Sequence, residues 1–273
     1  MPIATLTTDW GTSDYYVAAL KGRILSACPE ICIVDISHEP SYLESIAQGA
    51  YQLRHAYPFF PKGSIHVVGV CSEAYPEEPF IAAEANGQLF ICKNNGFLSL
   101  VLDDFVSATA IAPPAERAAS FGMLHAVPPA VQQLLHGAPV GSLGEAITPK
   151  AFTQPQPIVR FDPTEIAAGQ GVKPRVDAIV GHILHIDSHG NVITNITREL
   201  FYGSAHDRPY TILINSTRYS LSQVGSTYDS VSGGMPVAFF NAQDLLEIAV
   251  NQGNASHLYR LDSAGSITIK FQN

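Results

Sequence analysis

The sequence predicts an α/β domain followed by an all-β domain, and three observations lead to this prediction. In the first half, apolar strand-like runs alternate with segments of helical periodicity, which is typical of a parallel α/β sheet. From Val176 onward, short β-branched or apolar runs recur between turns, as in a small barrel or sandwich. A stretch with little periodicity, from Thr153 to Gly171, separates the two patterns. We therefore expect domains at residues 1–160 and 175–273.

The chain opens with a predicted βα unit. A short β-prone run ends at Asp9, and a helix-period apolar stripe begins at Tyr16. Ser13 or Asp14 offers an N-cap for this helix. The carboxyl ends of strands face the ligand crevice in open α/β sheets, so Asp9 is placed to accept hydrogen bonds from a ribose diol. Asp9 is equally explained as a turn residue, and the stretch lacks the GxGxxG and GK[ST] patterns of phosphate-binding loops.

Two compact apolar runs follow, and both predict parallel strands. They are Ile31–Ile36, expected to be buried on both faces, and Ser64–Val70. A helical pattern from Tyr42 to His55 joins them. Asn86-Gly87 then predicts the turn of a β-hairpin.

Two further helices and a set of short strands complete the predicted elements. Asn94-Asn95-Gly96 precedes a helical segment at Phe97–Leu102, and Pro128–His136 predicts another helix. The runs expected to form the all-β domain are Ile179–Ile186, Val192–Ile196, Tyr210–Ile214, Met235–Phe240, Leu246–Val250 and Ser266–Phe271.

Composition restricts the class of protein. The 273 residues are 46% hydrophobic and 14% charged, which is ample material for a core. The net charge of −9 argues against a nucleic-acid partner. No apolar run reaches about 18 residues and no leader pattern is seen, so we expect a cytoplasmic protein without a membrane partner. The cysteines are too dispersed for a disulfide framework or a metal site.

The densest group of polar residues is in the second half. Asp187, Asn191 and Asn195 stand among apolar residues in HIDSHGNVITNI. An asparagine side chain offers a donor and an acceptor, which matches the edge of adenine. Gly190-Asn191 equally suits a hairpin turn for backbone reasons alone.

An ordered set of motifs resembles the S-adenosyl-L-methionine (SAM) hydroxide adenosyltransferase family, which includes the SAM hydrolases, the fluorinase and the chlorinase. The motifs are TTDWGTSDYYVAALKG, NNGFLSLV, HIDSHGNVITNI and LLEIAVNQGNAS. The resemblance implies a Rossmann-like N-terminal domain, a smaller C-terminal β-barrel domain and a homotrimer, with the adenosyl site between neighbouring subunits. The implied reaction is SAM plus water giving adenosine and L-methionine, with no metal or other cofactor.

The resemblance also implies binding roles. Asp9 matches the aspartate that holds the ribose hydroxyls. Asn95 matches an asparagine that lines the pocket, although it is equally explained as a helix cap. Asp187 matches the aspartate near the methionine amino group, and Asn191 matches the asparagine on the adenine edge.

Aromatic and backbone contacts with adenine are implied in the same way. Tyr228 matches an aromatic residue that stacks on the ring. His189 stands where the halogenases have a phenylalanine, and an imidazole can still stack. The backbone at Val250 and Gln252 matches the strand that pairs with adenine.

The positions that hold the hydrolases' catalytic aspartate, arginine and histidine differ in this chain. They are occupied by Cys71, Glu78 and Phe121, and His125 lies only a few residues from the last position. The resemblance therefore covers the binding residues but not the catalytic triad.

Two substitute arrangements remain open. Cys71 acts as a nucleophile if its thiolate is stabilised, or it is a small apolar filler. Glu73, Glu77, Glu78 and His125 supply a different base, or the glutamates belong to a solvated loop. The sequence thus predicts a SAM hydrolase of doubtful activity, with a non-catalytic adenosyl-ligand binder or an enzyme using another nucleophile as alternatives.

Overall fold

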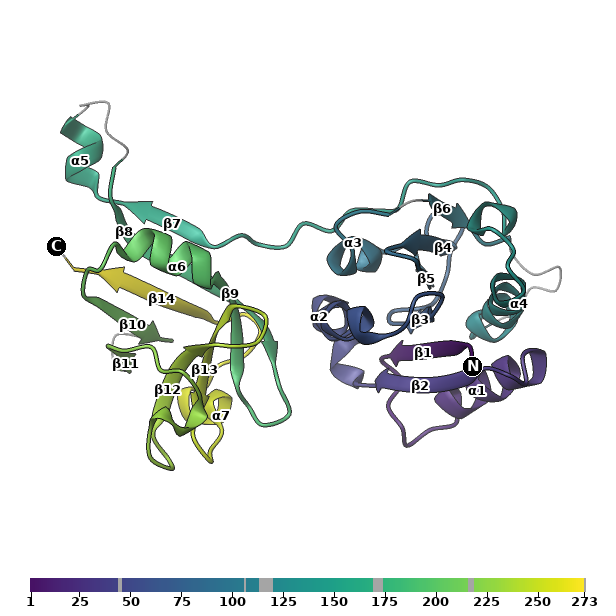
Figure 1. The fold of residues 1–273 in the computed structure, drawn as a ribbon, viewed down its shortest axis with the longest axis horizontal. Coiled ribbons are helices and arrows are strands. Elements are labelled where there is room, and N and C mark those ends of the chain that lie inside the picture. Colours follow the sequence, from purple (N-terminus) through teal and green to yellow (C-terminus); the bar gives the residue numbers. More distant parts are fainter. Residues whose placement is uncertain (44–45, 106, 113–119, 169–173, 216–218, 273) are drawn as a thin grey trace. The chain divides into compact units, whose positions relative to one another are not determined.

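The computed structural model describes residues 1–43, 46–105, 107–112, 120–168, 174–215 and 219–272. The chain divides into two compact units, Met1–Gln154 and Pro155–Asn273, each with its own hydrophobic core (Figure 1). The first unit is a Rossmann-like α/β domain and the second holds a nearly closed, barrel-like antiparallel sheet, which confirms the predicted fold class.

The first unit is built on a six-stranded sheet with the strand order β2-β1-β3-β5-β4-β6. Its strands are β1 (Ile3–Thr8), β2 (Cys32–Ser37), β3 (Ile65–Gly69), β4 (Phe80–Ala85), β5 (Gln88–Lys93) and β6 (Ser107–Ala110). The pairs β1/β2, β1/β3 and β3/β5 are parallel, whereas β4 pairs antiparallel with β5 and β6. The hairpin prediction is confirmed: Asn86 and Gly87 connect β4 to β5 with positive φ angles of 54° and 74°.

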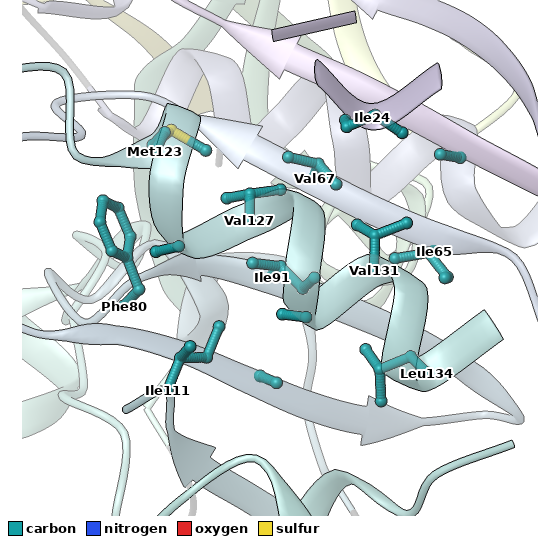
Figure 2. Packing of buried hydrophobic residues seen from close by; sticks show 14 of the residues in the cluster. Ile24, Ile65, Val67, Phe80, Ile91, Ile111, Met123, Val127, Val131 and Leu134 are labelled. Atoms are coloured by element: carbon teal, nitrogen blue, oxygen red, sulfur yellow. The ribbon is translucent and has the colours of Figure 1, made fainter. Parts of the chain in front are cut away.

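Helices cover both faces of this sheet. They are α1 (Tyr16–Ala27), α2 (Ile46–Ala56), α3 (Phe97–Val101) and α4 (Met123–Leu135), with 3-10 helices η1 (Pro40–Leu43), η2 (Tyr57–Phe59) and η3 (Val140–Ser142). α1 and α4 share one core with β1, β3 and β5, and α2 and α3 pack in a second core on the other face. In the first core, buried side chains of α4 lie against those of β3 and β5 (Figure 2), among them Met123, Val127, Val131, Ile65, Val67 and Ile91.

After β2 the chain crosses β1, and β3 continues the sheet on the other side of β1. The helix between β1 and β2 packs on one face, and the helix between β2 and β3 packs on the other. β2 and β3 therefore flank β1 on opposite sides. The carboxyl ends of β1 and β3 form a topological switch point, the place where open α/β sheets bind ligands.

Two predictions for the first unit are wrong. The run at 31–36 does form a strand, but β2 is the edge strand and its residues are mostly half-exposed, because only β1 pairs with it. Neither Ser13 nor Asp14 caps α1, since the N-cap is Tyr15 and no side chain caps the helix. Residues 44 and 45 of the helix predicted at 42–55 lie outside the described residues, and α2 begins at Ile46.

α4 begins earlier than predicted, at Met123, so that Pro128 and Pro129 lie inside the helix. A proline has no N–H to donate to the carbonyl four residues before it. For Pro128 that carbonyl belongs to Leu124, and it accepts a hydrogen bond of 3.4 Å from Arg23 Nε of α1. A side chain of the neighbouring helix thus replaces the missing backbone donor.

The second unit contains an eight-stranded sheet with the order β11-β10-β14-β8-β9-β13-β12, and β7 pairs with β8. Its strands are β7 (Ile158–Phe161), β8 (Val176–Ile186), β9 (Val192–Thr197), β10 (Tyr210–Ile214), β11 (Ser220–Leu221), β12 (Pro236–Phe240), β13 (Leu245–Val250) and β14 (Ser266–Phe271). The helices are α5 (Pro163–Ala168), α6 (Arg198–Ala205), α7 (Ala255–Tyr259) and the 3-10 helix η4 (Tyr228–Ser230). All six strands predicted for this region are confirmed.

The stretch 153–171, which was predicted to have little periodicity, contains one strand and one helix. β7 pairs antiparallel with β8, and α5 follows it. Residues 169–171 of that prediction lie outside the described residues. Among the residues that the structure describes, no helix has the length and apolarity needed to cross a membrane.

Candidate functional site

Asp9 lies at the switch point of the first unit, immediately after β1. Its side chain is buried, with 5% of the residue exposed, and Oδ2 accepts a 2.7 Å hydrogen bond from the backbone N–H of Cys71, which follows β3. Burial raises the pKa of Asp9, and the Cys71 hydrogen bond opposes this rise. A carboxylate has about four acceptor positions, so the group can also accept two ribose hydroxyls.

The backbone around Cys71 is shaped to make this contact. Cys71 has a φ of 47°, in the left-handed region that residues with a side chain rarely adopt. Gly69 lies under the ring of Trp10, where a Cβ atom would overlap the indole. The close packing of Trp10 on Gly69 and the turn at Cys71 bring the ends of β1 and β3 together.

The sulfur of Cys71 is not activated by its surroundings. Burial, followed by the charge of Asp9, raises the pKa of the thiol, while Lys93 acts in the opposite direction. A thiol with a raised pKa is protonated near neutral pH, and the thiolate is the nucleophilic form. The raised pKa therefore disfavours a nucleophilic role for Cys71.

Asn95 makes structural contacts with both ends of its side chain. Oδ1 accepts from the backbone N–H of Phe97 at 3.2 Å, at the start of α3. Nδ2 donates to the carbonyl of Val70 at 3.3 Å, next to Cys71. The N-cap of α3 is Gly96 and makes no side-chain cap hydrogen bond, so Asn95 is not the cap residue. Its two hydrogen bonds hold it beside the switch point, and its contact with a ligand stays a prediction.

Glu78 forms ion pairs with two lysines. Lys93 Nζ, from a residue at the end of β5 that is 7% exposed, lies 2.7 Å from Oε2, and Lys150 Nζ lies 2.8 Å from Oε1. Hydrogen bonds from Lys150 and Lys93 lower the pKa of Glu78 to about 2. Lys93 also lies over the ring of Tyr75, 4.8 Å from its centroid. The Glu78 carboxylate is therefore ionised, and each of its oxygens is paired with an ammonium group.

Phe121 belongs to an aromatic cluster. Its ring meets Trp10 edge to face at 4.9 Å and Tyr16 at 5.4 Å between centroids. An apolar ring in this position can exclude water but cannot transfer a proton.

The alternative base arrangement is not assembled. Glu73 and Glu77 are exposed and His125 is half-buried on α4. Among these described side chains, no hydrogen bond or ion pair joins Glu78 to any of the other three.

In the second unit, Asp187 organises the turn between β8 and β9. Its Oδ1 accepts the backbone N–H groups of His189 and Asn191 at 2.9 and 2.8 Å, and its Oδ2 accepts Asn191 Nδ2 at 2.9 Å. Gly190 has a φ of 81°, and a Cβ atom there would overlap the Asn254 side chain. His189 is exposed on this turn. Asn195, in contrast, is structural: Oδ1 accepts from the His182 N–H at 2.8 Å.

Tyr228 continues this network to a buried carboxylate. Asn191 Nδ2 donates to the Tyr228 hydroxyl at 3.4 Å, and that hydroxyl donates to Glu247 Oε1 at 2.7 Å. Asn241 Nδ2 donates to Glu247 Oε2 at 3.1 Å. Burial raises the pKa of Glu247, whereas burial and the bond to Glu247 raise the pKa of Tyr228. The Tyr228 ring meets Phe239 edge to face, with 4.7 Å between centroids.

The end of β13 packs beside the same turn. Val250 is buried and its carbonyl accepts from Gly253 N–H at 2.9 Å, while Gln252 is exposed with a φ of 56°. Ser256 N–H donates to the carbonyl of Gly190 at 2.9 Å and so ties the segment after β13 to the turn. The second unit thus brings the predicted residues of both motifs into one region.

Two surface cavities lie elsewhere in the second unit. A cavity of about 820 Å³ is lined by β7, α5 and α6, and one of about 530 Å³ by residues of α6 and its surroundings. None of the predicted site residues lines either cavity. The described residues contain no group of three or more His, Cys, Asp or Glu side chains able to hold a metal ion.

Comparison with known proteins decides the family. Residues 4–144 match the model of the SAM hydroxide adenosyltransferase N-terminal domain, and residues 181–268 match that of the C-terminal domain. The chain belongs to the SAM hydroxide adenosyltransferase family.

Relatives within this family match the chain over nearly its whole length. It is 26% identical to a fluorinase of an Actinoplanes species over 98% of this chain and 97% of that protein. It is 27% identical to an (R)-S-adenosyl-L-methionine hydrolase of Methanocaldococcus jannaschii over 98% and 96%. A crystal structure of an uncharacterized conserved protein from Thermotoga maritima shares the fold, with a TM-score of 0.80, 23% identity and coverage of 98% and 99%.

Two charged residues of this chain were not predicted from the sequence. Lys93 ends the apolar strand QLFICK, and Glu247 lies within LLEIAV. A charged residue in an apolar strand must find a partner when it is buried. A charged residue in each apolar strand therefore indicates that a partner exists, but it does not identify the partners as Glu78 and Tyr228.

Proposed function

We propose that this protein binds SAM and hydrolyses it slowly to adenosine and L-methionine, with the ribose diol held by Asp9. The observation that carries the proposal is the Asp9 carboxylate, buried at the β1/β3 switch point and fixed through one oxygen by Cys71 N–H. Membership of the SAM hydroxide adenosyltransferase family supports the ligand class, because the relatives that it resembles include a hydrolase of SAM.

The reaction is a substitution at the ribose C5′ carbon. A water oxygen forms the new bond to C5′, and the bond from C5′ to sulfur breaks. The bonding electron pair neutralises the sulfonium, so methionine leaves as a neutral thioether, and the attacking water releases its proton to solvent. Because the leaving group is already activated, positioning of water and exclusion of bulk solvent supply much of the required effect. No metal or other cofactor takes part in this scheme.

Binding without turnover is the second candidate, and the three substituted positions favour it. Cys71 has a raised thiol pKa, Glu78 is paired with Lys93 and Lys150, and Phe121 is apolar. A protonated thiol, a carboxylate paired with two lysines and an apolar ring are each poor proton acceptors. General-base assistance typically contributes about 10²–10⁴-fold, so its loss is expected to slow hydrolysis by this order.

Assembly and location form part of the same proposal. We expect a cytoplasmic homotrimer in which Asp9 of one subunit and Asp187, Asn191 and Tyr228 of a neighbour share one adenosyl ligand. His189, Asn95 and the backbone at Val250 and Gln252 would complete it. A monomeric mass by native light scattering would contradict this arrangement.

Product analysis tests the function. The purified protein is incubated with SAM, with and without chloride, and adenosine, 5′-chloro-5′-deoxyadenosine and methionine are quantified over time. Equal, slow release of adenosine and methionine supports hydrolysis, and calorimetric binding of adenosine without any release supports the second candidate. A chlorinated product indicates a different nucleophile. Neither binding nor turnover would reject both candidates.

A further inference from the structure

Glu247 has no part in the scheme above, although it lies at the centre of the Asn191–Tyr228 network. It is 4% exposed and belongs to a strand that is otherwise apolar. Burying a carboxylate is costly unless hydrogen bonds compensate it. Both of its oxygens are engaged, one by the Tyr228 hydroxyl at 2.7 Å and the other by Asn241 Nδ2 at 3.1 Å.

Both neighbours of Glu247 are donors, and one of them has a fixed orientation. Asn241 Oδ1 accepts the backbone N–H groups of Gln243 and Leu245 at 3.0 and 3.2 Å, so Nδ2 must face Glu247. Position 247 therefore requires a side chain that only accepts hydrogen bonds, as an ionised carboxylate does. Burial and Glu247 raise the pKa of Tyr228, which keeps the phenol protonated as a donor.

The direction of the Tyr228 hydroxyl proton determines whether Asn191 Nδ2 faces an acceptor or a donor. A tyrosine hydroxyl has one proton, and here it points to Glu247. Its oxygen is then left to accept from Asn191 Nδ2, while Asp187 accepts from the same nitrogen. Both N–H bonds of the Asn191 amide are engaged in this way, and Oδ1 is the atom left for a ligand. An acceptor in this position suits the 6-amino group of a purine and repels a 6-oxo group.

We propose that Glu247 is a positioning residue that fixes the Tyr228 proton and thereby, together with Asp187, the Asn191 amide, so that the site selects 6-amino over 6-oxo purine nucleosides. This inference rests on the proposed adenosyl-ligand binding. Glu247 touches no ligand in this arrangement, and its effect passes through Tyr228.

Glu247→Gln tests the proposal because it keeps the shape and replaces one acceptor by a donor. Asn241 Nδ2 is fixed as a donor, so the new NH₂ group faces the Tyr228 hydroxyl, which can rotate, and the phenol proton turns toward Asn191 Nδ2. Tyr228→Phe removes the hydroxyl from a residue that is 40% exposed and keeps the aromatic ring. Adenosine and inosine affinities are measured by calorimetry for the wild type, both single variants and the double variant.

We expect each single variant to lower the adenosine-to-inosine affinity ratio about tenfold, and the double variant to equal a single one, because both act through the same hydroxyl. Glu199→Gln, on the exposed first turn of α6, is the matched control and leaves the ratio unchanged. The proposal is overturned if the adenosine-to-inosine affinity ratio is unchanged in Tyr228→Phe. It is also overturned if Glu247→Gln lowers this ratio equally in the wild type and in Tyr228→Phe. Should Glu247→Gln fail to fold, Tyr228→Phe still tests the hydroxyl through which Glu247 acts, and an unchanged ratio there overturns the proposal. Absence of adenosine binding by the wild type would reject the proposed function instead.

Discussion

Replacing Asp9 by Asn is expected to weaken adenosine binding and to stabilise the protein without ligand. The amide can still accept the Cys71 N–H through Oδ1, so the contact between β1 and β3 survives. What is lost is the charge, together with the second acceptor oxygen. Hydrogen bonds to a charged group are worth about 1.5–3 kcal/mol each, against about 0.5–1.5 kcal/mol for neutral ones. The difference predicts adenosine binding about 10–100-fold weaker.

The stability change has the opposite sign because burial raises the pKa of Asp9. The folded protein holds the proton to a higher pH than the unfolded chain does. Ionisation therefore lowers the free energy of unfolding as pH rises through the folded pKa, and the full penalty is present above it. An asparagine carries no such penalty. We expect Asp9→Asn to be at least as stable as the wild type at pH 7, with the difference vanishing below the ordinary aspartate range.

Calorimetry with adenosine at pH 7 and urea denaturation at pH 7 and about pH 3 measure both effects. Glu78→Gln is the matched control, because Glu78 lies in the same unit but has a lowered pKa of about 2. It is expected to retain most of the adenosine affinity and to lose stability at pH 7. Equal losses of affinity in the two variants would refute the ribose role of Asp9, and a clear loss of stability in Asp9→Asn would refute the burial argument.

Three further predictions concern single groups. Lys150 and Lys93 depress the pKa of Glu78 to about 2, so the stability that Glu78 contributes is complete above about pH 4.5 and is lost as pH falls toward 2. If the free energy of unfolding changes with pH in the wild type as it does in Glu78→Gln, this prediction is contradicted. Burial lowers the pKa of His66 to about 4, so the free energy of unfolding should rise by about 3 kcal/mol between pH 4 and 6.5, and an imidazole that titrates near 6.5 by NMR would be inconsistent with the buried state. The raised thiol pKa of Cys71 predicts slow alkylation by iodoacetamide at pH 7.5 and SAM turnover that survives Cys71→Ser, whereas turnover abolished by this change would restore the nucleophile hypothesis.

The sequence determined the architecture because periodicity and turn chemistry are local. The hairpin at Asn86-Gly87 and the six strands of the second unit follow from neighbouring residues. The ordered motifs identified the family and placed Asp9, Asn191 and Tyr228 among the candidates. Predictions failed where contacts with neighbouring elements matter. β2 is half-exposed because it is an edge strand, and in α4 the Leu124 carbonyl that Pro128 leaves without a donor accepts from Arg23 of α1.

Only the tertiary structure decided the electrostatics of the candidate site, because it depends on contacts between residues far apart in sequence. The Cys71 N–H that binds Asp9 comes from 62 residues away, and Lys150 reaches Glu78 across 72 residues. The sequence shows only an acidic residue at position 78, whereas the fold supplies two ammonium groups that offset its charge. In the sequence, Glu247 is only a charged residue within LLEIAV. Its hydrogen bond to Tyr228 joins η4 to β13, and no spacing in the sequence predicts that pairing.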